Sequence, residues 1–430
     1  MIMRTLLTLS DADRRYLAHV SHLAFGNPFG ETGRSVRKAL SKEMSPGDDA
    51  LCDRVHAHLH DRLERLKQKQ DNLISAYAEQ DRLLLHHAVL FDCLHNARKA
   101  FDTLIAEQLQ KGGQVCKVAF GTNLLDLLTR SGMARSVALH YLAIYYQTRR
   151  ARYFLKTTLI GHGASMERLR HDLWNSIFTY DFSIYERFLW DRVRELSTLF
   201  VGANGSGKKT AAAAVSYCSY IPYIEKSETF AESFVNCFIP VKVAQYSGLQ
   251  LESALFGHKK MAYAEALENY QGAFSRCSPF GTIFLNNICE VPFPVQARLE
   301  EVVQEHLFTP VGDQIRQNFS GRLMASAPGK IASIRSEGRL RDTLYFSLGV
   351  NTISIPSLQH RLQEDPSDLE LLIVHILRKY TGQSSAQLLG PVIERMHEHV
   401  GVGYAWPGNL LELEQIVKRI LMVSHYESKN

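Results

Sequence analysis

Residues 199–215 read LFVGANGSGKKTAAAAV, and this stretch decides how the rest of the chain is interpreted. A short apolar segment is followed by a glycine-rich turn and an alanine-rich segment, which predicts a strand, a loop and a helix. Gly202, Gly207 and Lys208 fit G-x-x-x-x-G-K, the pattern of a phosphate-binding loop. In such a loop, converging backbone N–H groups and a helix N-terminus face the phosphate oxygens. The sequence therefore predicts a nucleotide-binding loop.

All residues of this loop are expected to contact the nucleotide. They are Gly202, Ala203, Asn204, Gly205, Ser206, Gly207, Lys208 and Lys209. Lys208 is expected to reach the outer phosphates. Lys209 stands where most such loops place Ser or Thr to hold Mg²⁺, so the loop departs from the usual pattern at the metal.

The composition is that of a soluble globular protein, with 430 residues, 45% hydrophobic and 22% charged. This length predicts two or three domains. We expect a cytoplasmic protein, because there is no apolar run of membrane-spanning length and no signal peptide. The seven cysteines include no C-x-x-C pair, which favours reduced thiols over disulfides or a zinc site. The net charge of +5 is spread along the chain and is weak support for nucleic-acid binding.

Three regions are expected along the chain. Residues 1–180 read as mostly helical, and residues 181–355 alternate strand-like apolar runs with helical stretches, which is typical of an α/β fold with a mostly parallel sheet. Residues 356–430 read as helices again. His56 and His60 have a spacing that a metal could use, but they lack a pattern such as H-E-x-x-H, so we expect packing or surface histidines and no metal site.

Five further stretches occur in the order and spacing of one protein family. They are LESALFGHKK (251–260), GTIFLNNI (281–288), VPFPVQARLEEVVQEHLFTPVGD (291–313), LRDTLYFSLGV (340–350) and WPGNLLELEQIV (406–417). With the phosphate-binding loop, they resemble the central AAA+ domain of bacterial sigma-54-dependent transcription activators over about residues 185–424. The resemblance implies a P-loop AAA+ core in 181–355, a helical lid in 356–430 and an all-α regulatory or sensory region in 1–180. It also implies ATP as cofactor, a ring assembly and sigma-54 RNA polymerase as partner.

Several positions that carry the chemistry of this family differ here. Asn286 and Asn287 replace the Asp that organises Mg²⁺ and the Glu that polarises the attacking water. An amide neither supplies the negative charge that Mg²⁺ favours nor accepts a proton as a base. The less favoured alternative is that Glu290, three residues further on and past the strand end, substitutes for them. Pro328 replaces an Asn that senses the γ-phosphate, and Leu411 replaces a lid Arg that contacts the nucleotide.

The family's arginine-finger and polymerase-contacting positions are only partly kept. Arg341 matches the first finger candidate, and Ser347 replaces the second. Arg341 either completes a neighbouring subunit's site, a role worth about 10³–10⁵ in rate, or pairs with a carboxylate across a subunit interface. MAYAEA (261–266) stands for the polymerase-contacting G-A-F-T-G-A, keeping the aromatic as Tyr263 but neither glycine. The residues after Leu421 are too few for a helix-turn-helix, so DNA binding through that module is not expected.

These departures lead to a preferred function and two alternatives. The preferred one is a degenerate AAA+ protein that binds ATP without a productive Mg²⁺ site, hydrolyses little and acts through contacts with sigma-54 RNA polymerase or AAA+ paralogues. The first alternative is a working ATPase that activates sigma-54 transcription. The second is an interaction module that no longer uses a nucleotide.

Overall fold

The computed structural model describes residues 6–41, 48–67, 74, 76–329, 337–382, 385–401 and 403–422. Contacts divide the chain into two compact units. The first, here called the helical unit, comprises Met1–Tyr153, Ile177–Asp191 and Tyr217–Asn236. The second, here called the core unit, comprises Phe154–Ser176, Arg192–Ser216 and Cys237–Asn430. The boundaries of these two units differ from those of the three regions expected from sequence. The reason is that the chain crosses from one unit to the other several times.

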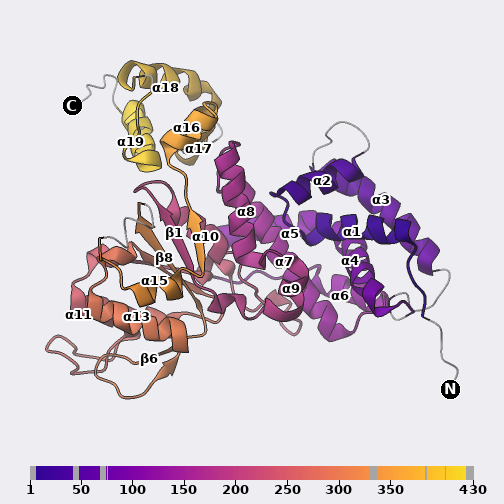
Figure 1. The fold of residues 1–430 in the computed structure, drawn as a ribbon, viewed down its shortest axis with the longest axis horizontal. Coiled ribbons are helices and arrows are strands. Elements are labelled where there is room, and N and C mark those ends of the chain that lie inside the picture. Colours follow the sequence, from indigo (N-terminus) through magenta and orange to yellow (C-terminus); the bar gives the residue numbers. More distant parts are fainter. Residues whose placement is uncertain are drawn as a thin grey trace. The chain divides into compact units, whose positions relative to one another are not determined.

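A five-stranded parallel sheet forms the centre of the core unit (Figure 1). Its strands are β1 (Thr198–Gly202), β4 (Phe238–Lys242), β5 (Thr282–Asn286), β8 (Arg322–Pro328) and β9 (Asn351–Ser354). Their spatial order is β4-β5-β8-β1-β9, and every neighbouring pair is parallel. The carboxyl ends of the strands therefore lie at one edge of the sheet, where ligands of open α/β sheets bind. The α/β fold with a parallel sheet that the sequence predicts is confirmed.

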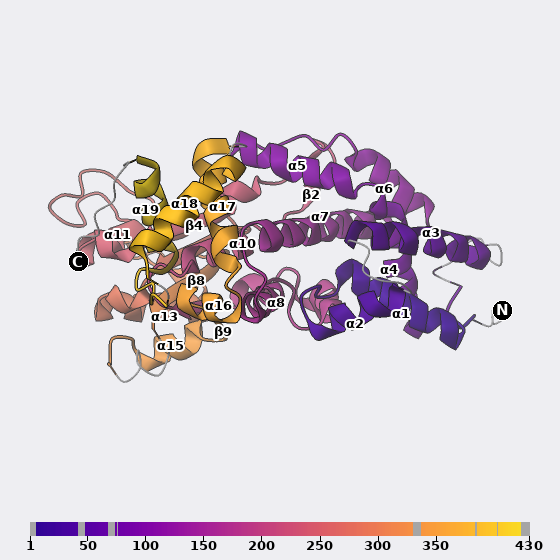
Figure 2. The same cartoon turned by 90° about the horizontal axis from the view of Figure 1, so that it is seen from above.

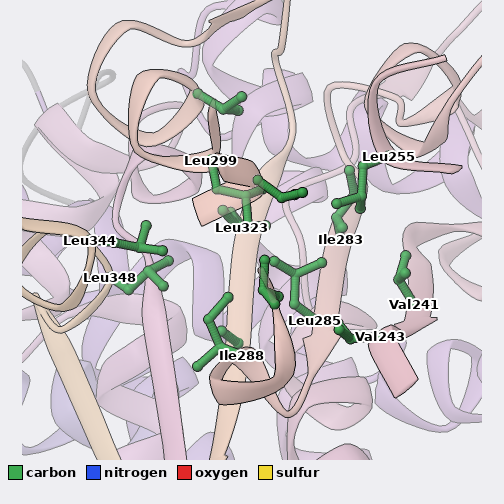
Figure 3. Packing of buried hydrophobic residues seen from close by; sticks show 14 of the residues in the cluster. Val241, Val243, Leu255, Ile283, Leu285, Ile288, Leu299, Leu323, Leu344 and Leu348 are labelled. Carbon is green, nitrogen blue, oxygen red and sulfur yellow. The ribbon is translucent and has the colours of Figure 1, made fainter. Parts of the chain in front are cut away.

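One face of the sheet packs against a layer of helices through a large apolar cluster. The helices of this layer are α11 (Gly248–Phe256), α12 (Ala273–Arg276), α13 (Phe293–Glu305) and α15 (Asp342–Leu348). Figure 3 shows Ile283, Leu285 and Leu323 of the sheet among Leu299 and Leu344 of the helices. Side chains alternate along a strand, so residues between these turn to the opposite face.

The opposite face of the sheet is buried as well. Phe200 and Phe284, from β1 and β5, lie there with their ring centroids 6.4 Å apart. Helix α10 (Lys208–Ser216) contacts β1, β4, β5 and β8, and its residues Ala211, Ala212 and Ala214 are buried. Burial on both faces explains why the strands read as near-continuous apolar runs in the sequence.

The lid consists of four helices with an apolar core of their own. They are α16 (Leu358–Glu364), α17 (Asp368–Thr381), α18 (Ser385–His399) and α19 (Asn409–Met422). Arg361 and Asp368 form a buried ion pair, with 3.0 Å between Nη2 and Oδ2. The same groups bind backbone ahead of α8, since Asp368 accepts from His162 N and Arg361 donates to Ile160 O. The lid is therefore tied to residues 160–162 by buried polar contacts.

The helical unit is almost entirely α-helical, as the sequence predicts for its N-terminal part. Its helices are α1 (Asp11–Phe25), α2 (Glu31–Leu40), α3 (Asp48–Lys67), α4 (Glu79–His95), α5 (Arg98–Lys111), α6 (Gly121–Arg130), most of α7 (Arg135–Thr157) and the short α9 (Phe182–Ile184). The long α7 lies between α5 and α1 (Figure 2), because Arg149 pairs with Asp102 and Arg152 donates to Leu23 O. Helix α8 (Ala164–Phe178) belongs mostly to the core unit.

The segment 217–236 lies between α10 and β4 in the sequence but belongs to the helical unit. It carries a hairpin of β2 (Tyr223–Ile224) and β3 (Thr229–Phe230). A second hairpin, β6 (Leu307–Phe308) with β7 (Gln317–Asn318), belongs to the core unit. Within the described residues, no helix combines the length and apolar character needed to cross a membrane.

Candidate nucleotide-binding site

The phosphate-binding loop connects the end of β1 to the start of α10, as the sequence predicts. Gly202 ends β1 and Lys208 begins α10. Gly205 and Gly207 have φ angles of 75° and 102°, a left-handed region in which only glycine is unstrained. The loop lies beside β8 and β9, because β1 pairs with both. The N-terminus of α10 thus faces the edge of the sheet where the parallel strands end.

Lys208 and Ser206 supply the polar groups of the loop. Lys208 Nζ donates to Gly202 O at 2.6 Å and to Ala203 O at 2.9 Å. The side chain is buried, and burial lowers the pKa of Lys208. Ser206 Oγ is buried and has no hydrogen-bond partner among the described residues. An unpaired hydroxyl beside a buried ammonium fits an anionic, oxygen-rich ligand such as the phosphates of ATP.

The lid contacts the loop directly at the start of α19. Asn409 Nδ2 donates to Asn204 O at 2.9 Å, and Leu410 N donates to Gly205 O at 3.1 Å. The other end of the Asn409 amide accepts from Leu358 N at 2.8 Å. A Cβ on Gly205 would lie 2.2 Å from Gly408 O, so the two backbones approach as closely as glycine allows. The contacts of Asn409 with the loop and with Leu358 were not predicted from the sequence, because these partners lie far away along the chain.

A cavity of about 230 Å³ adjoins the loop within the core unit. It is lined on the loop side by Ser206 and Thr210 and on the lid side by Lys379 and Glu414. Hydrogen bonds from Tyr380 and Lys379 lower the pKa of Glu414 to about 2. Pockets that enclose a whole ligand measure about 300–1,000 Å³, so this cavity suits one part of a nucleotide, such as the base.

Two amides stand at the end of β5, where the family has two carboxylates. Asn286 Oδ1 accepts from Ser326 Oγ at 3.1 Å, and Asn287 N donates to the same hydroxyl oxygen at 3.0 Å. Asn287 has a left-handed φ of 66°, and its Nδ2 donates to Glu290 Oε1. Asn287 Oδ1 is buried and, within the described chain, has no hydrogen-bond partner. The carboxylate of Glu290 is thus hydrogen-bonded to Asn287, the residue that directly follows β5.

Pro328, at the end of the neighbouring strand β8, carries no side-chain donor and pairs in register with Gly202. Asn286, Asn287 and Pro328 are therefore uncharged groups at the ends of β5 and β8. Across the residues that the structure describes, no group of three or more His, Cys, Asp or Glu side chains is placed to hold a metal ion.

Arg341 lies away from the loop, immediately before α15. Its Nε is 3.5 Å from Glu300 Oε2 of α13, and its backbone N donates to Gln296 Oε1 at 2.9 Å. The side chain is 42% exposed, so the guanidinium is accessible to another molecule. Leu411 is exposed on the lid, and Ser347 Oγ donates to Thr343 O. The structure therefore joins the loop with the lid and places Arg341 apart from them.

Two hydrogen-bonded loops, residues 257–270 and 309–317, are here called the paired loops. Lys259 N donates to Val311 O at 2.9 Å, and Lys259 Nζ lies 3.2 Å from Asp313 Oδ2. Tyr263 packs edge-on to His258 with 5.0 Å between ring centroids. Large apolar side chains nevertheless remain exposed on these loops: Met261 at 83%, Leu267 at 77% and Ile315 at 68%.

Comparison with known proteins identifies relatives of this region. Residues 189–354 match the family described as "Sigma-54 interaction domain". The chain is 29% identical to the regulatory protein AtoC of Escherichia coli over 54% of this chain and 46% of AtoC. It is 31% identical to the response regulator protein PilR of Pseudomonas aeruginosa over 51% of this chain and 45% of PilR. The chain thus spans about half the length of these curated relatives.

Two further similarities extend over more of the chain. The nitrogen fixation protein VnfA of Azotobacter vinelandii is 25% identical over 98% of this chain and 74% of VnfA. Among solved structures, NtrX from Brucella abortus is 20% identical, with a TM-score of 0.43 over 70% of this chain and 63% of NtrX.

The contact between lid and loop predicts a strong effect of adding one methyl group at Gly205. Gly205→Ala should lower the free energy of unfolding by at least about 1–2 kcal/mol, because a Cβ is strained at this φ and would collide with Gly408 O. Gly248→Ala is the matched control, since a Cβ there meets nothing within 4 Å. Urea denaturation of both variants measures the difference, and equal stability would contradict the observed approach of lid and loop.

Proposed function

We propose that this chain, whose residues 189–354 match the family described as "Sigma-54 interaction domain", is a sigma-54-interacting AAA+ regulator that binds ATP but is impaired in hydrolysis. The observation that carries the proposal is a contrast within one site. The phosphate-binding loop keeps its glycines and Lys208, whereas the adjacent strand ends carry Asn286, Asn287 and Pro328. The protein would then act through the contacts it makes with other proteins.

ATP binding is supported by the loop and by the cavity beside it. Lys208 already lies between two carbonyl oxygens, and phosphate oxygens would provide a stronger, charged partner. Ser206 Oγ offers an unpaired donor. The cavity beside Thr210 would receive the base or sugar. ATP bound in this way would supply a triphosphate that contacts both the loop and the lid.

Impaired hydrolysis is supported by the neutral strand end. Without Asp and Glu at 286 and 287, neither a carboxylate that would organise Mg²⁺ nor a general base is present at that position. Loss of a general base alone lowers a rate by about 10²–10⁴-fold. The losses act on one step, so they do not multiply. We therefore expect weak turnover.

A working ATPase is the second candidate, and one contact favours it. Asn287 Nδ2 donates to Glu290 Oε1, which keeps a carboxylate next to the strand end. If Glu290 accepts the proton of the attacking water, hydrolysis survives with a displaced base. This candidate differs from the first in its rate of ATP hydrolysis.

The expected partner is sigma-54 RNA polymerase, with AAA+ relatives as the second class. The paired loops include the stretch that aligns with the family's polymerase-contacting loop, and they expose Met261, Leu267 and Ile315. The partly exposed Arg341 is suited to a neighbouring subunit of a ring, where it would contribute positive charge to another nucleotide.

One prediction of this proposal concerns ATP binding. ATP should raise the thermal stability of the protein, and Lys208→Ala should abolish that increase, because a ligand that binds only the folded state stabilises it by about 2.7 kcal/mol at 100 times its Kd. Lys99→Ala, an exposed site in the helical unit, is the control and should respond like the wild type. An unchanged ATP response in Lys208→Ala would contradict the assignment of the loop.

A second prediction separates binding from hydrolysis. The wild type should release phosphate from ATP well below about 1 s⁻¹, the low end of common enzyme rates. Asn286→Asp combined with Asn287→Glu should raise turnover by up to about 10²–10⁴-fold. Adding Lys208→Ala to that pair should remove the gain. Wild-type turnover near 1 s⁻¹ that is lost in Glu290→Gln would instead establish the second candidate.

Partner binding is tested on the paired loops. Purified sigma-54 should bind the wild type, and Met261→Ser with Leu267→Ser should weaken binding at least about tenfold, a change of 1.4 kcal/mol. Leu127→Ser removes an exposed leucine, 43% accessible, in the helical unit and serves as the control. Equal binding by all three proteins would exclude the paired loops as the contact surface.

A further inference from the structure

The segment 217–236 is covalently inserted between two elements of the core unit. It leaves at the end of α10 and returns at Cys237, the residue before β4. Ser216 Oγ donates to Cys237 O at 2.7 Å, and both residues are buried. The chain therefore leaves and re-enters the core unit at one fixed point, at the C-terminal end of the helix that begins at the phosphate-binding loop.

Three successive carbonyl groups after α10 each accept a hydrogen bond from helix α7. Arg150 Nη1 donates to Tyr217 O and Arg150 Nη2 donates to Ser219 O, both at 2.7 Å. Gln147 Nε2 donates to Cys218 O, also at 2.7 Å. Gln147 and Arg150 lie one helical turn apart, so they project from the same face of α7. This face of α7 therefore fixes the backbone that directly follows α10.

The burial of Arg150 shows that this contact is a strong constraint. Its relative exposure is 0%, and its guanidinium lies 4.3 Å from the centroid of the Tyr146 ring. A buried cation is tolerated only when its environment compensates for the lost water, here through two carbonyl oxygens and an aromatic face.

The rest of the segment is held within the helical unit along its length. Phe230 stacks on Tyr146 with 4.0 Å between ring centroids. Val118 N donates to Glu228 O at 2.8 Å, and Ser233 Oγ donates to Gly112 O at 2.7 Å. The segment thus follows the helical unit when that unit changes conformation.

Gln147 also contacts the chain that leads into β1. Tyr185 OH donates to Gln147 Oε1 at 2.7 Å, and both side chains are buried. Tyr185 begins a π-helix, Tyr185–Leu189, a rare geometry that is frequent at functional sites. A few residues later the chain enters the core unit at Arg192 and forms β1. A single face of α7 therefore binds the chain on both sides of the strand–loop–helix that carries the phosphate-binding loop.

We infer that Gln147 and Arg150 are positioning residues for the phosphate-binding loop, and that through them the helical unit sets the affinity for nucleotide. This inference rests on the proposed binding of ATP. Neither side chain needs to touch the ligand, because each fixes the backbone flanking β1 or α10. Binding couplings are reciprocal, so nucleotide binding must in turn stabilise the contacts of 217–219.

The test compares two arginines of α7 in the full chain. Arg150→Lys should weaken ATP binding, measured by titration at a temperature well below unfolding, by about tenfold. Arg152→Lys is the matched control, because Arg152 also donates to backbone carbonyls, those of Leu23 and Ala24, and should keep the wild-type Kd. A merely structural role of Arg150 would lower the melting temperature and leave the Kd unchanged.

Hydrogen exchange in the wild type tests the same coupling without a substitution. ATP should slow amide exchange in 217–236, and Lys208→Ala should abolish that protection. Tyr185→Phe, which removes a single hydroxyl, replaces Arg150→Lys if the latter does not fold, and should weaken ATP binding in the same direction.

The possible failures are distinguishable. Equal ATP affinity in Arg150→Lys and Arg152→Lys, with exchange in 217–236 unaffected by ATP, would overturn this inference and leave the proposed function standing if Lys208→Ala still abolishes binding. A wild type that binds no ATP would overturn both.

Discussion

The parallel pairing of β1 with β8 and β9 is the constraint on which the candidate site depends. It places the end of β1 next to the end of β8, and β8 next to β5, so the loop, Pro328 and the two asparagines share one edge of the sheet. Apolar burial on both faces fixes this register, because a shift by one residue would turn every side chain to the opposite face. The scaffold of the site therefore remains rigid whatever groups its strand ends carry.

The end of β5 keeps its place in the sheet, although it lacks the two carboxylates that the family has there. Asn286 keeps the size of the Asp that the family places there, whereas Asn287 is one methylene shorter than the family's Glu. Both residues bind Ser326 Oγ, through a side-chain oxygen or a backbone N–H. Neutral amides lower the cost of burying this edge, because they need no counter-charge. They also remove the field that would order a divalent cation. Under the proposed function, the same substitutions weaken hydrolysis.

The sequence was most informative where partners are close along the chain. The strand, loop and helix at 199–215 follow from glycine placement and apolar runs, and the structure confirms them. The contacts of Asn409 with Asn204 and Leu358 were not foreseeable, since they join residues more than 50 positions apart. The same reason explains why 217–236 read as part of the α/β region. Its apolar and turn residues resemble those of the core, and the structure shows through contacts far upstream, such as those with Tyr146 and Arg150, where it packs.

A loop bonded to the lid and flanked by backbone that α7 fixes can use nucleotide binding itself as the signal. A ligand shifts a conformational equilibrium only by the difference in its affinity for the two states, and hydrolysis is not needed for that shift. The lid carbonyl and amides at 408–410 contact the loop, and Arg150 and Gln147 hold the chain that follows α10. Triphosphate entering the loop must accommodate both sets of contacts. Slow hydrolysis would then lengthen the bound state, so loss of the carboxylates at 286 and 287 is compatible with a regulator that responds to nucleotide occupancy.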